Sequence, residues 1–353
     1  MEDPCLYGIH RSNRRCVDHW GKNTFNSSFP ASLACWMRDS EIPAVALALR
    51  PDLSVENRAM SFDQVFGTTH PNEAIIFDFE SKYEPYQQYS YDDIKGIDLV
   101  IKTDAGFCRA LEIKLTVVPD NTTADLASGS WGAELVLRPA STSYATLGMA
   151  HSLRDNLRDV RAIFEPVCSR VRDWTNKSEM QGHLPQILRM LDDFEAEFCS
   201  FQIPFLMQPI WRTQRKSAVL TDNAFDIFVW TDFALTRLFI DSAKIDEARI
   251  SRPSREAIRM AKALYDLSTR GKFSVEDIYT GISLGFQTDK ACSFPGRVTN
   301  RYMRGARLAA PAVTKHALPK IILNGGEREL SPERRFDQTV YFTAAIEREV
   351  ETP

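Results

Sequence analysis

The stretch KGIDLVIKTDAGFCRALEIKLTVV, residues 95–118, decides the fold that we expect. Its two halves are rich in strand-forming residues, and the segment Thr103–Gly106 between them has the residues of a tight turn. This pattern predicts a buried β-hairpin. Asp98, Glu112 and Lys114 interrupt the hairpin at positions where apolar residues are expected.

The turn determines where these three charged residues lie. If the turn centres near Ala105, Asp98 lies opposite Glu112 on the neighbouring strand. Side chains alternate between the two faces of a strand, so Glu112 and Lys114 share a face. The three groups then converge at one end of one sheet face, whereas a slip of one residue in the register would separate them.

This arrangement suits the hydrolysis of a phosphodiester. Two carboxylates at strand spacing repel each other as bare anions, and a hard divalent cation such as Mg²⁺ relieves the repulsion by taking oxygen ligands. A metal-bound water can act as the nucleophile while the metal polarises a phosphoryl oxygen. Lys114 beside the metal orients that water and stabilises the charge on the phosphorane oxygens. The alternative is an exposed edge strand with a Glu–Lys pair on its solvent face.

Two other triplets with the pattern [DE]-x-K compete with Glu112–Lys114. Glu80–Lys82 follows a strand-like run and has Asp63 upstream, whereas Asp93–Lys95 lies in a polar, tyrosine-rich segment. The apolar residues on both sides of Glu112, together with an acid at hairpin distance, favour the hairpin triplet.

Apolar periodicity along the rest of the chain predicts both strands and helices. We expect strands at 74–80, 97–101, 107–118 and 133–138, and helices at 144–172 and 185–200. Residues 224–240 fit a strand that passes into a helix, although periodicity alone does not separate the two.

Two further helices are expected near the C-terminus. The first spans 254–271, with Ser254 as its N-cap and Gly271 as its stop. The second spans 274–285 and begins with a Ser274–Asp277 pair that resembles a capping box. The element order predicts an α/β fold with a mixed β-sheet core flanked by helices. We expect one elaborated domain, 1–353, with the catalytic core at about 60–240 and a C-terminal region at about 241–353.

Composition is that of a soluble globular protein. The chain has 353 residues, 44% of them apolar and 25% charged, and no apolar run approaches the ~20 residues of a membrane span. The N-terminus lacks the apolar segment of a signal peptide, so we expect a cytoplasmic protein. Seven dispersed cysteines indicate free thiols. Cys5, His10, Cys16 and His19 lack a C-x₂-C pair, so they indicate a zinc site only weakly.

Charge is segregated along the chain although the net charge is only −4. The segment 290–320 has seven basic residues and no acid, which favours contact with DNA. Arginine can bridge guanine O6 and N7, asparagine can read adenine, and the other cations meet phosphates. The candidates are Lys290, Arg297, Asn300, Arg301, Arg304 and Arg307, with a second patch at Arg212, Arg215 and Lys216. The alternative for both patches is a solvated polar loop. No G-x₄-G-K-[ST] or G-x-G-x-x-G motif indicates a nucleotide cofactor.

The hairpin residues GIDLVI and ALEIKLTVVPD are similar to the PD-(D/E)xK nuclease motif, with Ile97 where the nominal motif has proline. More of the chain resembles the HindVP-type family of type II restriction endonucleases. The similar stretches are LYGIHRSNR, 6–14; WGKNTFNSSFPASLACWM, 20–37; WGAELVLRPAS, 131–141; MQPIWRTQRKS, 207–217; FDIFVWTDFA, 225–234; and DKACSFPG with TNRYMRGARL, within 289–308.

The resemblance implies a Mg²⁺-dependent endonuclease that cuts double-stranded DNA at a short palindrome, typically GRCGYC. It gives Asp98, Glu112 and Lys114 the catalytic roles. Many relatives have one more upstream acid, for which Glu73, Asp78 and Glu80 are candidates, and we choose Glu80 as the third metal ligand.

A palindromic target requires two active sites related by a two-fold axis, so we expect a homodimer. The helices within 254–285 are one possible dimer surface. Two other functions remain open: a repair or structure-specific PD-(D/E)xK nuclease, and a DNA-binding protein without catalysis.

Overall fold

The computed structural model describes a set of segments that runs from the N-terminus to residue 294. These segments are 5–6, 9–10, 44–49, 55–60, 75–81, 84–94, 96–103, 108–114, 135–137, 139–198, 205–207, 211–214, 217–220, 227–286 and 292–294.

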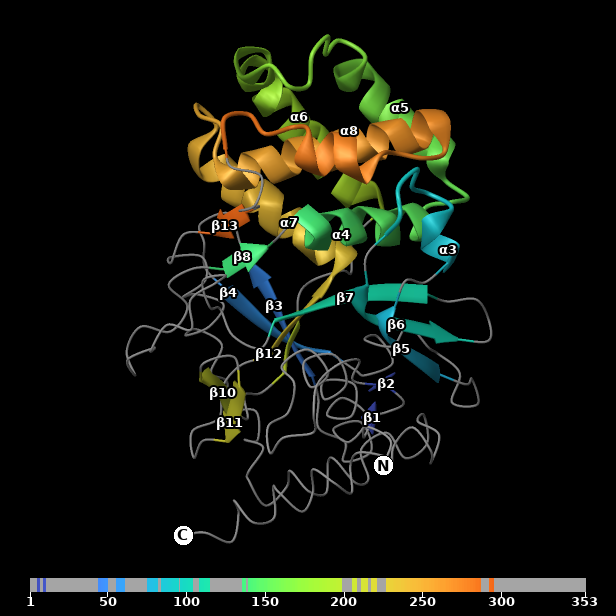
Figure 1. Ribbon diagram of the computed structural model, residues 1–353. Helices are drawn as coiled ribbons and strands as arrows, with labels where there is room; N and C mark the ends of the chain where they lie inside the picture. The colour runs from blue at the N-terminus through green and yellow to red at the C-terminus, as the bar shows by residue number, and fades with distance from the viewer. Residues whose placement is uncertain are drawn as a thin grey trace, which may run out of the picture.

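A seven-stranded sheet forms the base of the structure (Figure 1). In spatial order its strands are β4 (Val55–Met60), β3 (Ala44–Leu49), β9 (Phe205–Met207), β12 (Ile227–Thr231), β7 (Cys108–Lys114), β6 (Ile97–Thr103) and β5 (Ile75–Ser81). All of these neighbours pair antiparallel. The expected mixed sheet is therefore wrong in strand direction, because β12 runs opposite to both of its neighbours, β7 and β9.

Three small antiparallel pairs accompany this sheet. They are β1 (Cys5–Leu6) with β2 (Ile9–His10), β10 (Trp211–Gln214) with β11 (Ser217–Leu220), and β8 (Leu135–Leu137) with β13 (Cys292–Phe294).

Strands β6 and β7 are buried on both faces. Leu99 and Ile101 are buried on one face, while Val100 and Ala110 are buried on the other and belong to the main core. Strands covered on both sides show continuous apolar runs, which is why the hairpin was visible in the sequence. Edge strand β4 has the polar sequence VENRAM, which is typical of a protected edge but is a weak strand signal, and sequence analysis missed it.

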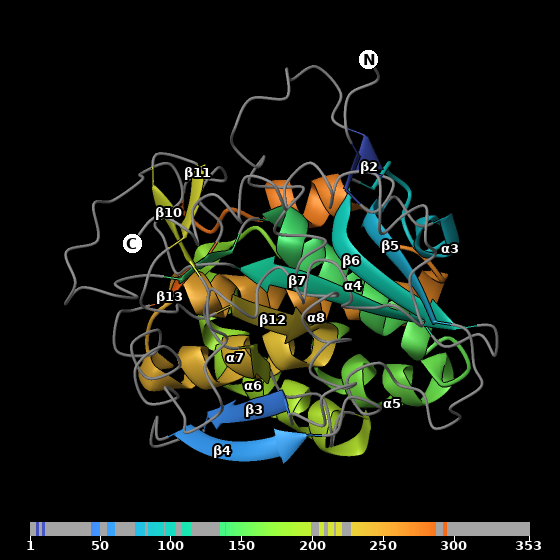
Figure 2. The same ribbon diagram turned by 90° about the horizontal axis from the view of Figure 1, so that it is seen from below.

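The helices are stacked on one side of the seven-stranded sheet, and together they are called the helical layer (Figure 1 and Figure 2). They are the short α3 (Glu84–Gln87), α4 (Pro139–Ser152), α5 (Leu157–Cys168), α6 (Lys177–Phe198), α7 (Asp232–Ala243) and α8 (Arg252–Arg270). None of the helices described is long and apolar enough to cross a membrane.

The expected helices differ from the observed ones mainly at their ends. The helix expected at 144–172 is two helices, α4 and α5, and the helix expected at 185–200 begins earlier, as α6. Residues 224–240 are resolved as strand β12 followed directly by α7. The β-branched and aromatic run IFVWT extends until Asp232, an acid that favours a helix N-terminus.

Helix α8 begins at Arg252, two residues before the serine that we expected to cap it. Its N-cap is Ser251, whose hydroxyl accepts the backbone N–H of Ser254 at 3.1 Å, and it ends at Gly271 with φ of 76°, as expected. The helix expected at 274–285 is only a π-helical turn, Glu276–Thr280. The hydroxyl of Ser274 does accept the N–H of Asp277, at 3.0 Å.

Three charged residues in the first half of α8, Arg255, Glu256 and Arg259, are completely buried. Arg259 donates to Glu256 at 2.6 Å and to the carbonyl of Ile282 at 2.9 Å, and Glu256 accepts from Thr142 of α4 at 3.1 Å. Arg255 is likewise buried beside Glu256. This part of α8 packs among the other helices, so it is not available as a dimer surface.

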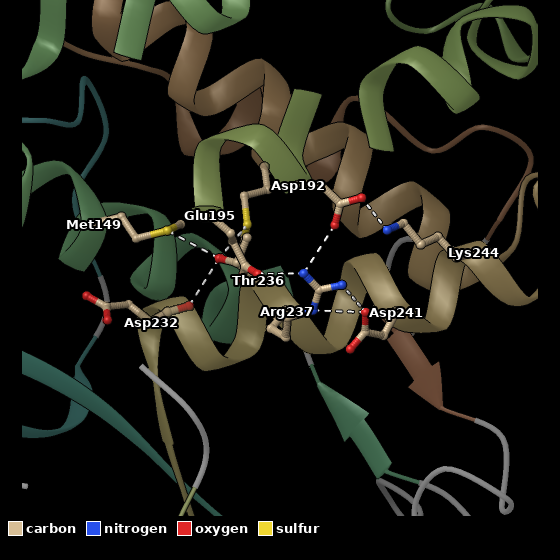
Figure 3. Close-up of polar contacts among 9 residues, drawn as sticks. Met149, Asp192, Glu195, Asp232, Thr236, Arg237, Asp241 and Lys244 are labelled. Atoms are coloured by element: carbon tan, nitrogen blue, oxygen red, sulfur yellow. Dashed lines mark hydrogen bonds and ion pairs between the residues drawn. The ribbon is translucent and has the colours of Figure 1, made fainter. Parts of the chain in front are cut away.

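A second polar network joins α6 to α7 (Figure 3). Arg237 donates to Asp192 at 3.1 Å and to Glu195 at 3.0 Å, and it also pairs with Asp241. Lys244 pairs with Asp192 as well. Burial raises the pKa of Glu195 to about 8, and the nearby Arg237 opposes that shift. Ionisation of Glu195 therefore works against folding.

Substitution of Glu195 by glutamine should stabilise the protein at high pH but not at low pH. The folded-state pKa is raised, so the stability contributed by protonated Glu195 is complete below its usual value of 4.5 and is lost as the pH rises toward about 8. At about 1.4 kcal/mol for each pKa unit, the advantage of Glu195→Gln should grow to a few kcal/mol across this range. Thermal unfolding at about pH 5 and about pH 9 measures the change.

The matched control is Glu197→Gln, because Glu197 is exposed on the same helix. It should shift the melting temperature little at either pH. An equal effect of Glu195→Gln at both pH values would contradict the buried ionisation.

Candidate active site

The register of the β6–β7 hairpin matches the one predicted from its turn. Leu99 pairs with Leu111 and Val100 with Ala110, so the hairpin is centred on position 105. The paired residues end at Leu99 and Leu111; the same register, continued by one residue inside both strands, brings Asp98 level with Glu112.

The neighbouring strand β5 adds a third acid to this row. Its ladder with β6 pairs Phe79 with Leu99 and Ser81 with Ile97, so Glu80 is the residue level with Asp98. Residues directly opposite each other in an antiparallel sheet share a face and lie about 5 Å apart at Cβ. Glu80, Asp98 and Glu112 therefore form one row across three adjacent strands, which we call the acid row.

The other candidate acids lie outside the acid row. Asp78 is level with Val100, one row further along the same face. Glu73 lies outside the described residues. Asp93 is exposed in the segment between α3 and β6, away from any strand. Register thus separates Glu80 from Asp78, which the sequence alone did not.

The strand registers place two further residues beside the acid row. Lys114 follows Glu112 by two positions in β7, so it falls on the same face one row further. Trp230 of β12 is level with Glu112 on the side opposite Asp98. Sequence analysis did not single out Trp230, because its position depends on a pairing between strands that are far apart in the chain.

A set of carboxylates in one row fits a hard divalent cation. Oxygen ligands at strand spacing, with a lysine on the next row, match what Mg²⁺ prefers and what phosphodiester hydrolysis requires.

Comparison with known proteins gives the family of the chain. The description of the matching family is HindVP restriction endonuclease, and the match covers residues 20–346. The chain belongs to the HindVP restriction endonuclease family. It is therefore a type II restriction endonuclease, a deoxyribonuclease that cuts double-stranded DNA at specific sequences.

Two relatives of this endonuclease match over nearly their whole length. The type II restriction enzyme HgiDI of Herpetosiphon aurantiacus is 37% identical over 355 residues, which cover 99% of each chain. A Haemophilus influenzae protein named probable type II restriction enzyme HindVP is 34% identical over 349 residues, which cover 98% of this chain and 95% of the relative. No solved structure matches the chain. The resemblance inferred from the sequence is thus confirmed.

The basic patch of Arg212, Arg215 and Lys216 is only partly described. Arg212 lies in β10, opposite Val219 of β11. The other candidates for DNA contact lie outside the described residues: Arg215, Lys216, Lys290, Arg297, Asn300, Arg301, Arg304 and Arg307.

Strand β13 lies within the basic segment 290–320 and connects it to the helical layer. Its residue Cys292 pairs with Leu137 of β8, and α4 begins at Pro139, two residues later. Both pairs, β8–β13 and β10–β11, lie on the side of the molecule toward which the β7 arrow points (Figure 1 and Figure 2). That is also the end of β7 at which Glu112 and Lys114 lie.

Of the weak zinc set, only Cys5 and His10 are described. They face each other in the β1–β2 ladder. Cys16 and His19 lie outside the described residues.

Proposed function

We propose that this chain is a Mg²⁺-dependent type II restriction endonuclease that cuts double-stranded DNA at GRCGYC. Family membership supports the reaction class, and the acid row supports the metal. The observation that carries the proposal is the register of three neighbouring strands, which aligns Glu80, Asp98 and Glu112.

Each residue of the site has a definite role in this proposal. Glu80, Asp98 and Glu112 hold the cation through carboxylate oxygens. Mg²⁺, when bound, acts as a Lewis acid and lowers the pKa of a bound water. Lys114 orients the attacking water and stabilises the negative charge that develops on the phosphate oxygens. The buried strands keep the acids at fixed separation, since β6 and β7 are apolar on both faces.

DNA binding rests on the two basic patches. The β8–β13 pair ties the segment 290–307 to the start of α4, which packs on β7. In the proposal, arginines and Asn300 of this segment enter a groove of the DNA, and Arg212, Arg215 and Lys216 contact the backbone or bases nearby.

The palindrome GRCGYC presents the same bases to two copies of the protein. Each copy cuts one strand, which requires a homodimer with two-fold symmetry. The exposed surface that forms this dimer does not include the buried first half of α8.

Digestion of a sequenced plasmid tests the function directly. With Mg²⁺, the protein should produce discrete fragments whose mapped ends all fall at GRCGYC, and without a divalent cation it should produce none. Cleavage at another fixed sequence would overturn the predicted site. A smear, or cutting guided by DNA structure, would indicate a repair-type nuclease, and binding without cutting would indicate a non-catalytic protein.

Substitutions in the hairpin should abolish cleavage while DNA binding remains. Asp98→Ala, Glu112→Gln and Lys114→Ala should each lower the single-turnover rate by about 10³-fold or more, because each removes a metal ligand or the charge that stabilises the transition state. Asp93→Asn is the matched control, since Asp93 heads a [DE]-x-K triplet outside the sheet. Full activity in the hairpin variants would overturn the site.

The same assay separates the candidates for the third acid. Glu80→Gln should raise the Mg²⁺ concentration needed for half-maximal cleavage, whereas Asp78→Asn should leave it nearly unchanged. If Asp78→Asn raised this Mg²⁺ concentration and Glu80→Gln did not, the third ligand would be Asp78, which is level with Val100.

Replacing arginines of the basic segment 290–320 should weaken DNA binding and should also make that binding less dependent on salt. Replacing Arg297, Arg301 and Arg304 by alanine should lower affinity and flatten the slope of log K against log salt by about 0.9 for each phosphate that is no longer neutralised. Fluorescence anisotropy without divalent cations measures both.

The control for charge removes three exposed arginines of the helical layer, Arg158, Arg170 and Arg172. It lowers the net charge equally, so an equal loss of affinity would show that only net charge matters and would contradict the proposed patch.

A further inference from the structure

Three elements meet at one close approach beside the acid row. If Gly148 of α4 carried a Cβ atom, that atom would lie 2.8 Å from Oδ2 of Asp232 and 3.3 Å from Cβ of Ala110. Asp232 begins α7, and Ala110 lies in β7. Helix α4 therefore approaches both the start of α7 and β7, the catalytic strand that contains Glu112, as closely as a glycine permits. We call this meeting point the α4–β7 junction.

Hydrogen bonds hold the start of α7 in the junction. The carboxylate of Asp232 accepts the N–H of Phe233 at 2.9 Å. Thr236, one turn later, contacts the sulfur of Met149 at 3.2 Å and that of Met260 at 3.1 Å. Figure 3 shows the carboxylate of Asp232 directed away from the Arg237 network, so it takes no part in the pairing of α6 with α7.

Asp232 and Arg109 influence each other from neighbouring elements. Burial raises the pKa of Asp232 to about 6, and the positive charge of Arg109 opposes the shift. Burial lowers the pKa of Arg109, and Asp232 opposes that shift in turn. Arg109 is three residues before Glu112 in β7, so an electrostatic link joins the catalytic strand to α7.

The α4–β7 junction lies one row from the acid row. Ala110 is two positions before Glu112 in β7, on the same face. On β12, Trp230 is level with Glu112, and Asp232 follows it by two positions. A shift of α4 or α7 at the junction would therefore first move Ala110 and Asp232, which lie one row from Glu112.

Stability alone does not explain the residues of the junction. A glycine inside a helix costs about 0.5–1 kcal/mol relative to alanine. A buried carboxylate whose pKa is raised is also unfavourable in its charged form. Features that lower stability and gather beside a catalytic strand are typical of functional positions.

We propose that Gly148 and Asp232 are positioning residues for cleavage. They set how closely α4 and α7 approach β7, and so fix Glu112 within the acid row. This inference rests on the proposed function, in which Glu112 holds the cation.

Gly148→Ala tests the inference. The added methyl group must displace Asp232 or Ala110, and a misplacement of about 1 Å at a catalytic group can slow a reaction by about 10²-fold. The single-turnover rate at saturating DNA should fall about 10- to 100-fold. DNA affinity without divalent cations should stay the same, because the basic patches are not altered. A rate equal to that of the wild type, or equal losses of rate and affinity, would overturn the proposal.

Gly182→Ala is the matched control. It makes the same change inside helix α6, where an added Cβ meets no atom within 4 Å. It should leave the rate unchanged, and a slower rate in this control would mean that the effect of Gly148→Ala is not specific to the junction.

A double-mutant cycle separates positioning from general damage. Asp232→Ala removes the oxygen that lies 2.8 Å from the added methyl group, so Gly148→Ala should slow cleavage less in that background than in the wild type. Additive losses would overturn the proposal even if Gly148→Ala alone folds poorly.

Failure of the proposed function has a different signature. Glu112→Gln would then still cleave at full rate, whatever the junction variants do.

Discussion

The registers of the β5–β6 and β6–β7 ladders are the constraint on which the site depends. Because side chains alternate between faces, a slip of one residue in either ladder would move an acid to the opposite face of the sheet. The apolar pairs Leu99–Leu111 and Val100–Ala110 prevent such a slip, since they are buried on opposite faces of the sheet. A slip of one residue would move side chains of each pair to the opposite face of the sheet, away from the part of the core in which they are buried.

The helical layer adds a second constraint, which acts through α4. This helix follows β8 almost directly and packs on β7, and its Thr142 donates a buried hydrogen bond to Glu256 of α8. Strand β13, inside the basic segment, pairs with β8. A continuous set of packed elements therefore connects that segment to the strand that contains Glu112.

The sequence predicted the local features well. The hairpin, its turn centre and the Asp98–Glu112 alignment follow from a short apolar stretch with turn residues between its halves, and the structure has the same register. The strand-to-helix passage before Asp232 is local in the same sense. Such features depend on residues close together in the chain, so their patterns carry the information directly.

The features that sequence analysis missed depend on distant parts of the chain. The direction of β12 relative to β7, the edge strand β4 and the place of Trp230 are set by pairings that leave no periodic signal. The charges of α8 were misleading for a related reason. Arg255, Glu256 and Arg259 have the spacing of a solvated face, but they pair with each other and with α4 inside the helical layer. Periodicity reports polarity, and it does not distinguish exposure to water from burial against a polar partner.

The acid row itself shows why such a site needs a rigid frame. Two unit charges about 5 Å apart repel by about 3 kcal/mol at an effective dielectric constant of about 20. Three acids in a row across β5, β6 and β7 push these strands apart unless a cation or protons neutralise them. Burial of β6 and β7 on both faces opposes that repulsion, because separation of the strands would expose Val100, Ala110 and their neighbours to water. The same apolar residues that made the acids look misplaced in the sequence therefore hold the acid row at its spacing.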